Sequence, residues 1–293
     1  MTNNRFRLIL SLARQVGLSQ ELSAIKQKGF VGLLCVCLFL TTGCDGFRLE
    51  VSKPGGGTAK EQAVVVPKKA IYPCIFTAEP IKVDGFLNEP IWEKAKVLDF
   101  IVPVTFMEPI SKTEGRIIYD NKYLYVGIKG YDQDIWSYFT ERDESTCRED
   151  VLEVFIKPDT AIHPDGPDPY YNFEINALGT VLDAFNGERG AAGNYTRWSN
   201  WNCNGLKIAI QVKGTLNNWQ DKDEYWTLEV AIPFAELPSL AGKSPQKGDA
   251  WLFHLARYDY SVYLPEGREL TSCAPLSKVD FHLYDDWMKL RFE

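Results

Sequence analysis

The clearest signal in this chain is the alternation of apolar and polar residues with a period of two. It is most regular in segment 170–176, whose apolar residues are Tyr171, Phe173 and Ile175 and whose polar residues are Asn172, Glu174 and Asn176. This pattern is typical of a β-strand with one dry face and one polar face. The segment therefore predicts a strand that presents a polar row.

A second strand is predicted from Cys147 to Ile156, because β-branched and aromatic residues dominate this stretch and Lys157-Pro158-Asp159 ends it. One face would hold Asp150, Leu152, Val154 and Ile156, and the other Val151, Glu153 and Phe155. Glu153 thus lies between apolar neighbours, where an unpaired charge is costly. Two alternatives follow: Glu153 meets a partner inside the fold, or its face is open to a polar ligand.

Most of the remaining pattern also predicts short strands that are separated by turns. These strands are 80–85, 116–119, 123–128, 180–185, 206–212, 225–232, 251–258 and 288–292. Segments 116–119 and 123–128 are predicted to form a hairpin. Short helical turns are predicted at 88–95, with Asn88 as N-cap, and at 233–237. Many short strands without a long amphipathic helix predict a sandwich or a barrel.

The N-terminal segment has the pattern of a targeting signal. Basic residues precede an apolar run, 30–40, that is too short to cross a bilayer comfortably. The run ends in Leu40-Thr41-Thr42-Gly43-Cys44, which resembles the lipobox of bacterial lipoproteins, where the cysteine becomes the acylated first residue. We expect a signal peptide at 1–43, lipidation at Cys44, a flexible tether at 44–71 and a folded domain at 72–293. An ordinary signal peptide or an anchoring helix is the alternative.

Composition supports a packed, acidic domain. The chain is 45% hydrophobic and 24% charged, which is enough for a core, and its formal net charge is −7. Residues 1–43 carry five Lys or Arg and one Glu, so their removal would change the net charge to −11. No nucleic-acid partner is expected, because phosphate binding needs clustered Lys and Arg.

Cysteine usage leaves the redox question open. Four cysteines lie in the expected domain: Cys74, Cys147, Cys203 and Cys273. An even count in an oxidising compartment permits two disulfides, and four buried thiols are the alternative. The spacing matches no zinc pattern. We expect no cofactor; carboxylates of Asp159, Asp165 and Asp168 would suit a structural Ca²⁺, against the simpler interpretation of a solvated turn.

Motifs of enzymatic chemistry are scarce. The three His residues stand in no metal-ligand spacing, and the chain has no Gly-x-Ser-x-Gly elbow and no phosphate-binding glycine loop. Glycoside hydrolysis by paired carboxylates remains an alternative if Glu153, Glu174 and Asp183 converge.

Carbohydrate binding fits the pattern better, because planar polar side chains bond sugar hydroxyls and flat rings stack on pyranose rings. Segment 172–176 supplies the polar row, and Glu153 would lie near it if the two predicted strands pair. Trp198, Trp201 and Phe281 lie in loop or strand-end positions, where exposed rings bind ligands. Alternatively, these rings cap the ends of the sandwich.

Several short motifs also follow one another in a recognisable order from about Tyr72 to the C-terminus. They are Ile81-Lys82-Val83-Asp84-Gly85, Glu89-Pro90-Ile91-Trp92, segment 119–126 with Asp132, and segments 150–156, 171–176, 226–234, 247–251, 281–282 and 287–292. In this order they resemble carbohydrate-binding module family 9 and its wider superfamily. The resemblance implies an all-β fold, an antiparallel, jelly-roll-like β-sandwich with a few short helical turns.

The resemblance also implies roles for single residues. In sugar-binding members two Trp rings sandwich the ligand, and Asp, Glu, Asn and Arg side chains bond its hydroxyls. By position, Asp132, Glu153 and Asn176 match the Asp, Glu and Asn; Glu174 replaces the Arg; Cys147 replaces one Trp, and Phe281 lies near the other. The expected ligand-binding residues are Asp132, Glu153, Glu174, Asn176, Phe281, Trp198, Trp201 and Arg257.

We therefore expect a non-catalytic carbohydrate-binding lipoprotein of the bacterial cell envelope. Its partners would be a glycan or oligosaccharide, the membrane through the lipid anchor, and a glycoside hydrolase in polysaccharide capture or catabolism. The alternative is a structural or partner-binding sandwich that has lost the sugar site, which a Glu153 paired with Arg257 or Arg116 in a closed interior would favour. A haem-binding relative is a further alternative, for which only Met107 and Met288 would remain after removal of 1–43.

Overall fold

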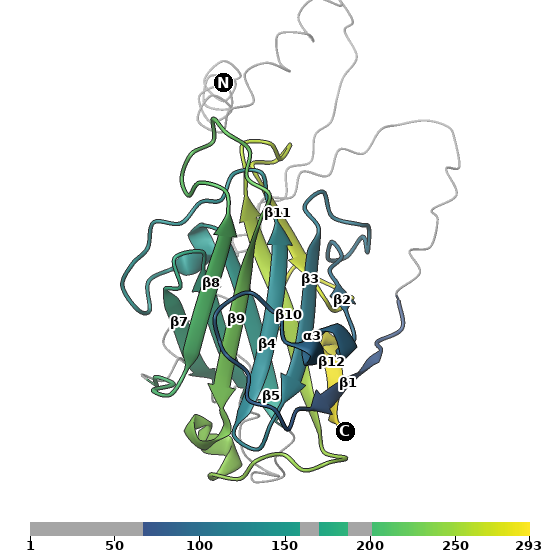
Figure 1. Ribbon diagram of the computed structural model, residues 1–293. Helices are drawn as coiled ribbons and strands as arrows, with labels where there is room; N and C mark the ends of the chain where they lie inside the picture. The colour runs from purple at the N-terminus through teal and green to yellow at the C-terminus, as the bar shows by residue number, and fades with distance from the viewer. Residues whose placement is uncertain (1–66, 159–169, 187–200) are drawn as a thin grey trace, which may run out of the picture. The chain divides into compact units, whose positions relative to one another are not determined.

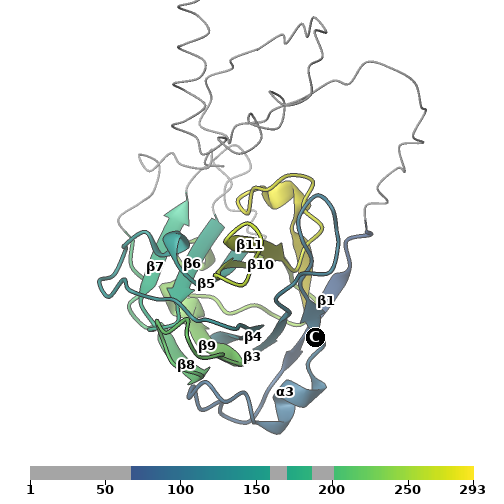
Figure 2. The same ribbon diagram turned by 90° about the horizontal axis from the view of Figure 1, so that it is seen from above.

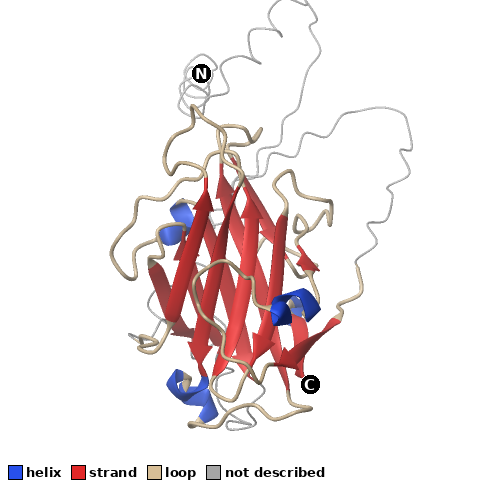
Figure 3. Cartoon of the chain, viewed as in Figure 1, coloured by secondary structure: helices blue, strands red, loops and turns tan. Residues whose placement is uncertain are grey.

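The computed structural model describes residues 67–158, 170–186 and 201–293, and this part of the chain consists mainly of β-strands (Figure 1, Figure 3). The strands are β1 (Ile71–Phe76), β2 (Leu98–Asp99), β3 (Thr113–Tyr119), β4 (Tyr123–Tyr131), β5 (Val151–Pro158), β6 (Tyr170–Asn176), β7 (Val181–Asn186), β8 (Lys207–Lys213), β9 (Tyr225–Pro233), β10 (Ala250–Tyr260), β11 (Arg268–Ser272) and β12 (Met288–Phe292). The short helices are α3 (Pro90–Lys94), η1 (Thr146–Arg148), η3 (Phe234–Glu236), η4 (Pro238–Leu240) and η5 (Tyr284–Asp286).

The strands form two sheets that share strand β1. Sheet A has the order β7-β6-β5-β10-β12, with β11 also paired to β10, and sheet B has the order β3-β4-β9-β8, with β2 paired to β3. The first four residues of β1 pair with β12 and its last two residues pair with β3. Figure 2 shows the two sheets as the opposite layers of a sandwich. The expected all-β sandwich is confirmed, with parallel pairing of β1 added to the antiparallel ladders.

Alternation along the strands fills the space between the sheets. On sheet A the inward residues include Leu152 and Val154, and on sheet B they include Val126 and Val230. All four are fully buried in one apolar core. Each such side chain contributes about 1.5–3 kcal/mol through removal of apolar surface from water.

A smaller apolar cluster covers part of the outer face of sheet B. Trp92 of α3 packs there against Ile118, Tyr125 and Ala231. Pro90 begins this five-residue helix, where its missing N–H costs no hydrogen bond. In the described part of the chain, no helix is long and apolar enough to cross a membrane.

Several predicted elements are confirmed. Segment 170–176 is β6, the predicted hairpin is β3–β4, and the turn after Pro233 is η3. The strand expected from Cys147 begins only at Val151, because Thr146–Arg148 form η1 and the backbone N–H of Asp150 donates to the Trp136 carbonyl oxygen instead of a neighbouring strand.

Two local predictions are wrong. Segment 80–85 is not a strand, because the N–H groups of Asp84 and Gly85 donate to the Glu229 carboxylate instead of a neighbouring strand. The N-cap of α3 is Glu89 and not Asn88. Strands β1, β2 and β11 were not predicted, since two of them are short and their patterns are irregular.

A buried ion-pair network crosses the sandwich at Arg257. This residue lies on the inward face of β10, opposite Leu152, and is fully buried. Its Nη2 lies 2.7 Å from Asp132 Oδ2 and 3.3 Å from Asp259 Oδ1. Its Nη1 donates to the Tyr131 carbonyl oxygen at 2.8 Å, at the end of β4. The guanidinium group therefore joins sheet A to sheet B.

We expect Arg257→Leu to lower the free energy of unfolding by about 3–5 kcal/mol, because it leaves buried carboxylates without their cation. Urea-induced unfolding would measure this loss. Arg268→Leu, at an exposed position on neighbouring β11, is the matched control and should change stability little. A loss below about 1 kcal/mol for Arg257→Leu, the size of an exposed ion pair, would contradict this role of the network.

Candidate functional site

Two carboxyl groups face each other on the outer face of sheet A. Strands β5 and β6 pair as predicted, and this register places Glu153 directly opposite Glu174. Both are buried, with Glu153 2% and Glu174 6% exposed. Glu174 accepts hydrogen bonds from Thr146 Oγ1 at 3.1 Å and from Asn172 Nδ2 at 3.0 Å. Glu153 has no hydrogen-bond donor among the described residues.

This environment raises the pKa values of both groups. Burial disfavours the charged form of Glu153, and the neighbouring Glu174 adds like-charge repulsion, so its pKa lies well above the ordinary value. Burial likewise raises the pKa of Glu174 to about 7, against the lowering effect of Thr146 and Asn172. At neutral pH the pair of carboxyl groups therefore carries less than two full negative charges.

Other polar groups converge on the same face. Burial is the main cause that raises the pKa of the Tyr258 phenol in β10. The charges of the nearby Glu153 and Glu174 raise this pKa further. Burial and the two carboxylates raise the pKa of the Cys147 thiol to about 11, so the thiol is protonated at neutral pH. The amide oxygen of Asn172 is buried and has no hydrogen-bond partner in the described part of the chain.

An aromatic layer covers one side of these polar groups. The ring of Phe281 lies 5.3 Å from that of Tyr258 and 5.5 Å from that of His254, between ring centroids. Phe281 therefore lies next to the polar face, where a candidate ring is expected. It is buried, however, so other side chains cover most of its surface.

The structure places the remaining predicted residues elsewhere. Asp132 and Arg257 bind each other between the sheets, on the side of sheet A opposite to Glu153. This placement follows from the register, which puts Arg257 opposite Leu152. Asn176 lies on the Glu153 side of β6, but its amide holds a turn: it donates to Glu149 Oε1 at 2.6 Å and accepts from the backbone N–H of Thr180 at 2.8 Å.

Of the two tryptophan candidates, the structure describes only Trp201. Trp201 packs against the rings of Tyr171, Phe173 and Phe185, so it caps the core, as the alternative interpretation proposed. Trp198 lies outside the described residues, as do Cys44 and the acidic loop with Asp159, Asp165 and Asp168.

The two disulfides that the cysteine count permits are not formed among these four residues. Cys74, Cys147, Cys203 and Cys273 are all free thiols, and three of them are buried. They lie in four different places: in β1, in η1, before β8 and after β11. The Cys273 sulfur instead accepts the backbone N–H of Leu255 at 3.2 Å. The fold therefore contains four separate thiols, and the alternative of four buried thiols holds for all but Cys147, which is half-buried.

An open groove next to this face was not predicted. It has a volume of about 350 Å³ and is lined by Trp136, Tyr138, Arg148 and Tyr260, among others. The Tyr138 side chain is 60% exposed, and its ring lies 5.8 Å from that of Trp136. The Tyr260 hydroxyl donates to the Cys147 carbonyl oxygen at 2.9 Å, which ties the groove to η1 and thus to Glu174.

A sequence signal for this groove existed. Trp136 and Tyr138 stand two residues apart after a predicted strand, so that both rings share one side of an extended segment. Glu149 holds this segment in place, because its Oε2 accepts the backbone N–H groups of Tyr138 and, at 3.1 Å, Phe139.

Carboxylates of Asp132, Asp150 and Asp259 form a separate buried group between the sheets. One oxygen from each lies within 4.8 Å of the others, a spacing that a metal ion would accept. Arg257 occupies the same neighbourhood and neutralises part of the charge. Burial is the main cause that raises the pKa of Asp132 to about 7, with Asp259 repulsion opposed by Arg257. Arg257 supplies the positive charge at this group, while both Asp259 oxygens are buried without a hydrogen-bond partner among the described residues.

Comparisons with known proteins place this geometry on a known fold. No protein-family model matches the chain, and no curated protein matches it. Among solved structures, a protein from Bacteroides uniformis whose suggested role is carbohydrate binding matches with a TM-score of 0.51 and 17% identity, over 76% of this chain and 97% of that one. This likeness shows a shared fold.

Two further structures come from one organism. A family 9 carbohydrate-binding module from Caldicellulosiruptor kristjanssonii in complex with cellotriose matches with a TM-score of 0.49 and 14% identity, over 76% of this chain and 94% of that one. A complex of such a module with glucose gives a TM-score of 0.46 and 12% identity, over 75% and 95% of the two chains. Family 9 modules, which the sequence resembles, are thus among the solved structures that match.

The raised pKa values make a prediction about stability. The folded chain binds protons more tightly than the unfolded chain, whose Glu groups titrate near pH 4.3, so the free energy of unfolding should fall as pH rises from about 4 towards 7. Glu153→Gln removes one charge without loss of a hydrogen bond to any residue in 67–158, 170–186 or 201–293. We expect this variant to be more stable than the parent at pH 8, by about 1 kcal/mol, and to show a smaller decrease with pH.

Thermal and urea unfolding between pH 4.5 and pH 8.5 would measure both effects, in the range set by these pKa values. Glu266→Gln, an exposed glutamate in a turn, is the control and should follow the parent profile. Equal profiles for Glu153→Gln and the parent would show that the carboxyl pair does not carry the pH dependence.

Proposed function

We propose that this chain is a non-catalytic carbohydrate-binding protein that is held at a bacterial membrane by lipid on Cys44. The observation that carries the proposal is Glu153, a buried carboxyl group without a hydrogen-bond donor among the described residues, opposite Glu174. Glu174 is connected through Thr146 and Cys147 to a groove lined with rings. Sugar hydroxyls are the donors that such a carboxyl group lacks, and exposed tyrosine and tryptophan rings suit the apolar faces of pyranose rings.

The ligand would span two adjoining parts of one site. Its apolar face would rest on Tyr138 and Trp136 in the open groove, and Arg148 would donate hydrogen bonds to its oxygens. Its inner hydroxyls would reach Glu153. Cys147 takes the place of a sandwich ring in this arrangement, and the rings of the groove would supply the stacking surface instead.

The arrangement of carboxylates supports binding over catalysis. Glycoside hydrolysis needs two carboxyl groups on either side of the scissile bond. Glu153 and Glu174 stand side by side on neighbouring strands, and burial raises both pKa values. Asp183, the third candidate, lies on the opposite face of β6–β7 and forms an ion pair with Arg142 at 2.5 Å.

A partner-binding sandwich without a sugar site is the second candidate. The burial of Glu153 and Phe281 favours it, since a sugar would have to reach side chains with little exposed surface. A glycoside hydrolase partner would fit either candidate, as a catalytic protein that uses the captured glycan.

Sugar binding is tested by calorimetric titration of the chain with cello- and xylo-oligosaccharides in the presence of Ca²⁺. We expect Tyr138→Ala to weaken binding about fivefold to tenfold through loss of a stacking ring, and Glu153→Gln to weaken it by a similar factor. Because Glu153→Gln should also be more stable at pH 8, its loss of binding would not reflect unfolding.

Tyr263→Ala is the matched control, because Tyr263 is an exposed tyrosine that does not line the groove. It should bind like the parent. Absence of binding to every glucan, xylan and monosaccharide would end the proposal and favour the partner-binding sandwich.

Membrane attachment is tested separately through Cys44. Expression of the whole chain in a bacterial host should give a lipid-modified protein in the membrane fraction, and Cys44→Ala should lose the modification. Mass spectrometry of the N-terminal peptide would measure it. Cys37→Ala, in the apolar run before the expected cleavage point, is the control. An unmodified Cys44 in the mature parent protein would contradict the lipoprotein assignment.

A further inference from the structure

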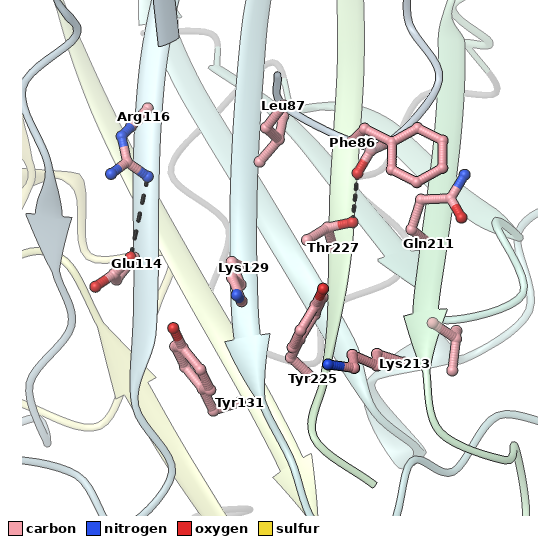
Figure 4. A pocket seen from close by; sticks show the side chains of 12 residues that line it. Phe86, Leu87, Glu114, Arg116, Lys129, Tyr131, Gln211, Lys213, Tyr225 and Thr227 are labelled. Carbon is pink, nitrogen blue, oxygen red and sulfur yellow. Dashed lines mark hydrogen bonds and ion pairs between the residues drawn. The ribbon is translucent and has the colours of Figure 1, made fainter. Parts of the chain in front are cut away.

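A second groove lies on the outer face of sheet B. Glu153 belongs to sheet A, so the two sites lie on different sheets. The groove has a volume of about 460 Å³, and its floor comes from β3, β4, β9 and β8. The floor residues are Glu114, Arg116, Lys129, Tyr131, Gln211, Lys213, Tyr225 and Thr227. Figure 4 shows their side chains on one face of these strands.

Lys129 is the central charge of this groove. Its Nζ lies 3.7 Å from the centroid of the Tyr225 ring and 4.7 Å from that of Tyr131 (Figure 4). Two rings thus hold the ammonium group by cation–π attraction. No carboxylate of the described residues forms an ion pair with Lys129, although Glu114 stands opposite it in the β3–β4 register.

The neighbouring charges leave the groove positive. Glu114 is already paired with Lys112 at 2.5 Å, and Arg116 lies 4.0 Å from its second oxygen. Lys213 is paired with Glu224 at 2.8 Å. Lys129 and most of the hydrogen-bonding capacity of Arg116 therefore remain available, on a chain whose net charge is −7. A local positive surface on an acidic protein selects an anionic ligand.

A loop forms one wall of the groove and is fixed to its floor. Thr227 Oγ1 donates to the Gly85 carbonyl oxygen at 2.5 Å, and Gln211 Nε2 donates to the Asp84 carbonyl oxygen at 2.8 Å. The buried carboxylate of Glu229 accepts the backbone N–H groups of both loop residues. The wall therefore holds Phe86 in place, and the side chain of Phe86 is 60% exposed.

We propose that this groove is a second binding site, which takes an oligosaccharide that carries carboxylate groups, such as a uronate. The carboxylate would bind Lys129 and Arg116, the exposed rings of Phe86 and Tyr131 would contact pyranose faces, and Gln211 would offer its amide oxygen to a hydroxyl. This site is independent of the Glu153 site, whose two carboxyl groups would repel an anionic sugar.

The backbone of the floor argues for a saccharide over an extended peptide. The strands of the floor pair with one another, β3 with β4, β4 with β9 and β9 with β8. The N–H and C=O groups of β4 and β9, which pair on both sides, are consequently used, so a peptide over the middle of the groove would find no main-chain partners there. Strand β8 is the edge of this sheet. Recognition must come from side chains, and rings with cations and amides suit a charged sugar.

The test is titration of the full chain, at low ionic strength, with trigalacturonate and with its fully methyl-esterified form, which keeps the sugar skeleton and removes the charge. We expect the acid to bind at least about tenfold more tightly than the ester, and Lys129→Gln to weaken acid binding about tenfold. Added salt should weaken acid binding, because the site is open to solvent.

Lys222→Gln is the matched control, since Lys222 also lies over a tyrosine ring, that of Tyr263 at 4.8 Å, but does not line the groove. It should bind the acid like the parent. Glu153→Gln and Tyr138→Ala should also leave acid binding unchanged, which separates this site from the neutral-sugar site.

Three results would overturn the proposal. Equal affinity for acid and ester would show that the site does not distinguish a charged sugar from a neutral one. Equal effects of Lys129→Gln and Lys222→Gln on acid binding would place the ligand elsewhere. Binding of hexaglutamate as tight as that of trigalacturonate would show a general anion surface instead of a saccharide site. Thermal unfolding of each variant would confirm that the protein remains folded.

Discussion

The position of Arg257 is the constraint on which the rest of the sandwich depends. A fully buried guanidinium group needs partners inside the fold, and its two Nη atoms find them on both sheets: Asp132, Asp259 and the end of β4. Gly130 is part of the same arrangement, because a Cβ there would lie 3.1 Å from the guanidinium carbon. The charge network therefore fixes the spacing of the sheets at this end, next to the segment that carries Trp136 and Tyr138. A binding groove at this place needs such a support.

Strand patterns were well predicted because they depend on local alternation. Segment 170–176 is a strand in the structure, and its pairing with β5 brings Glu174 opposite Glu153, as the polar row suggested. The faces to which Arg257 and Asp132 belong could not be predicted, because a shift of one residue in register reverses every side chain. That register is set by long-range pairing of β10 with β5, more than 90 residues earlier in the chain.

The candidate site in the structure differs from the site predicted from the sequence for a similar reason. Asn176 has the residue type of a sugar ligand, but its neighbours at Glu149 and Thr180 use its amide to hold a turn. Trp201 has the residue type of a stacking ring, but the gap beside Tyr171 and Phe173 accepts it into the core. Residue type and motif position thus identified which elements build the site. Whether a side chain contacts a protein neighbour or remains open to a ligand is decided only by the three-dimensional arrangement.

Strand β1 has a mechanical consequence. It is the first strand of the domain, and it pairs with β12 over residues 71–74 and with β3 over residues 75–76, in parallel to both. A pull on the chain that precedes Ile71 acts along this strand, so it loads several ladder hydrogen bonds together instead of one after another. Tyr72 adds resistance, because its hydroxyl is bonded to Ile117 across the interior. Force applied through the N-terminal segment would be shared by both layers of the sandwich at the first strand that it reaches.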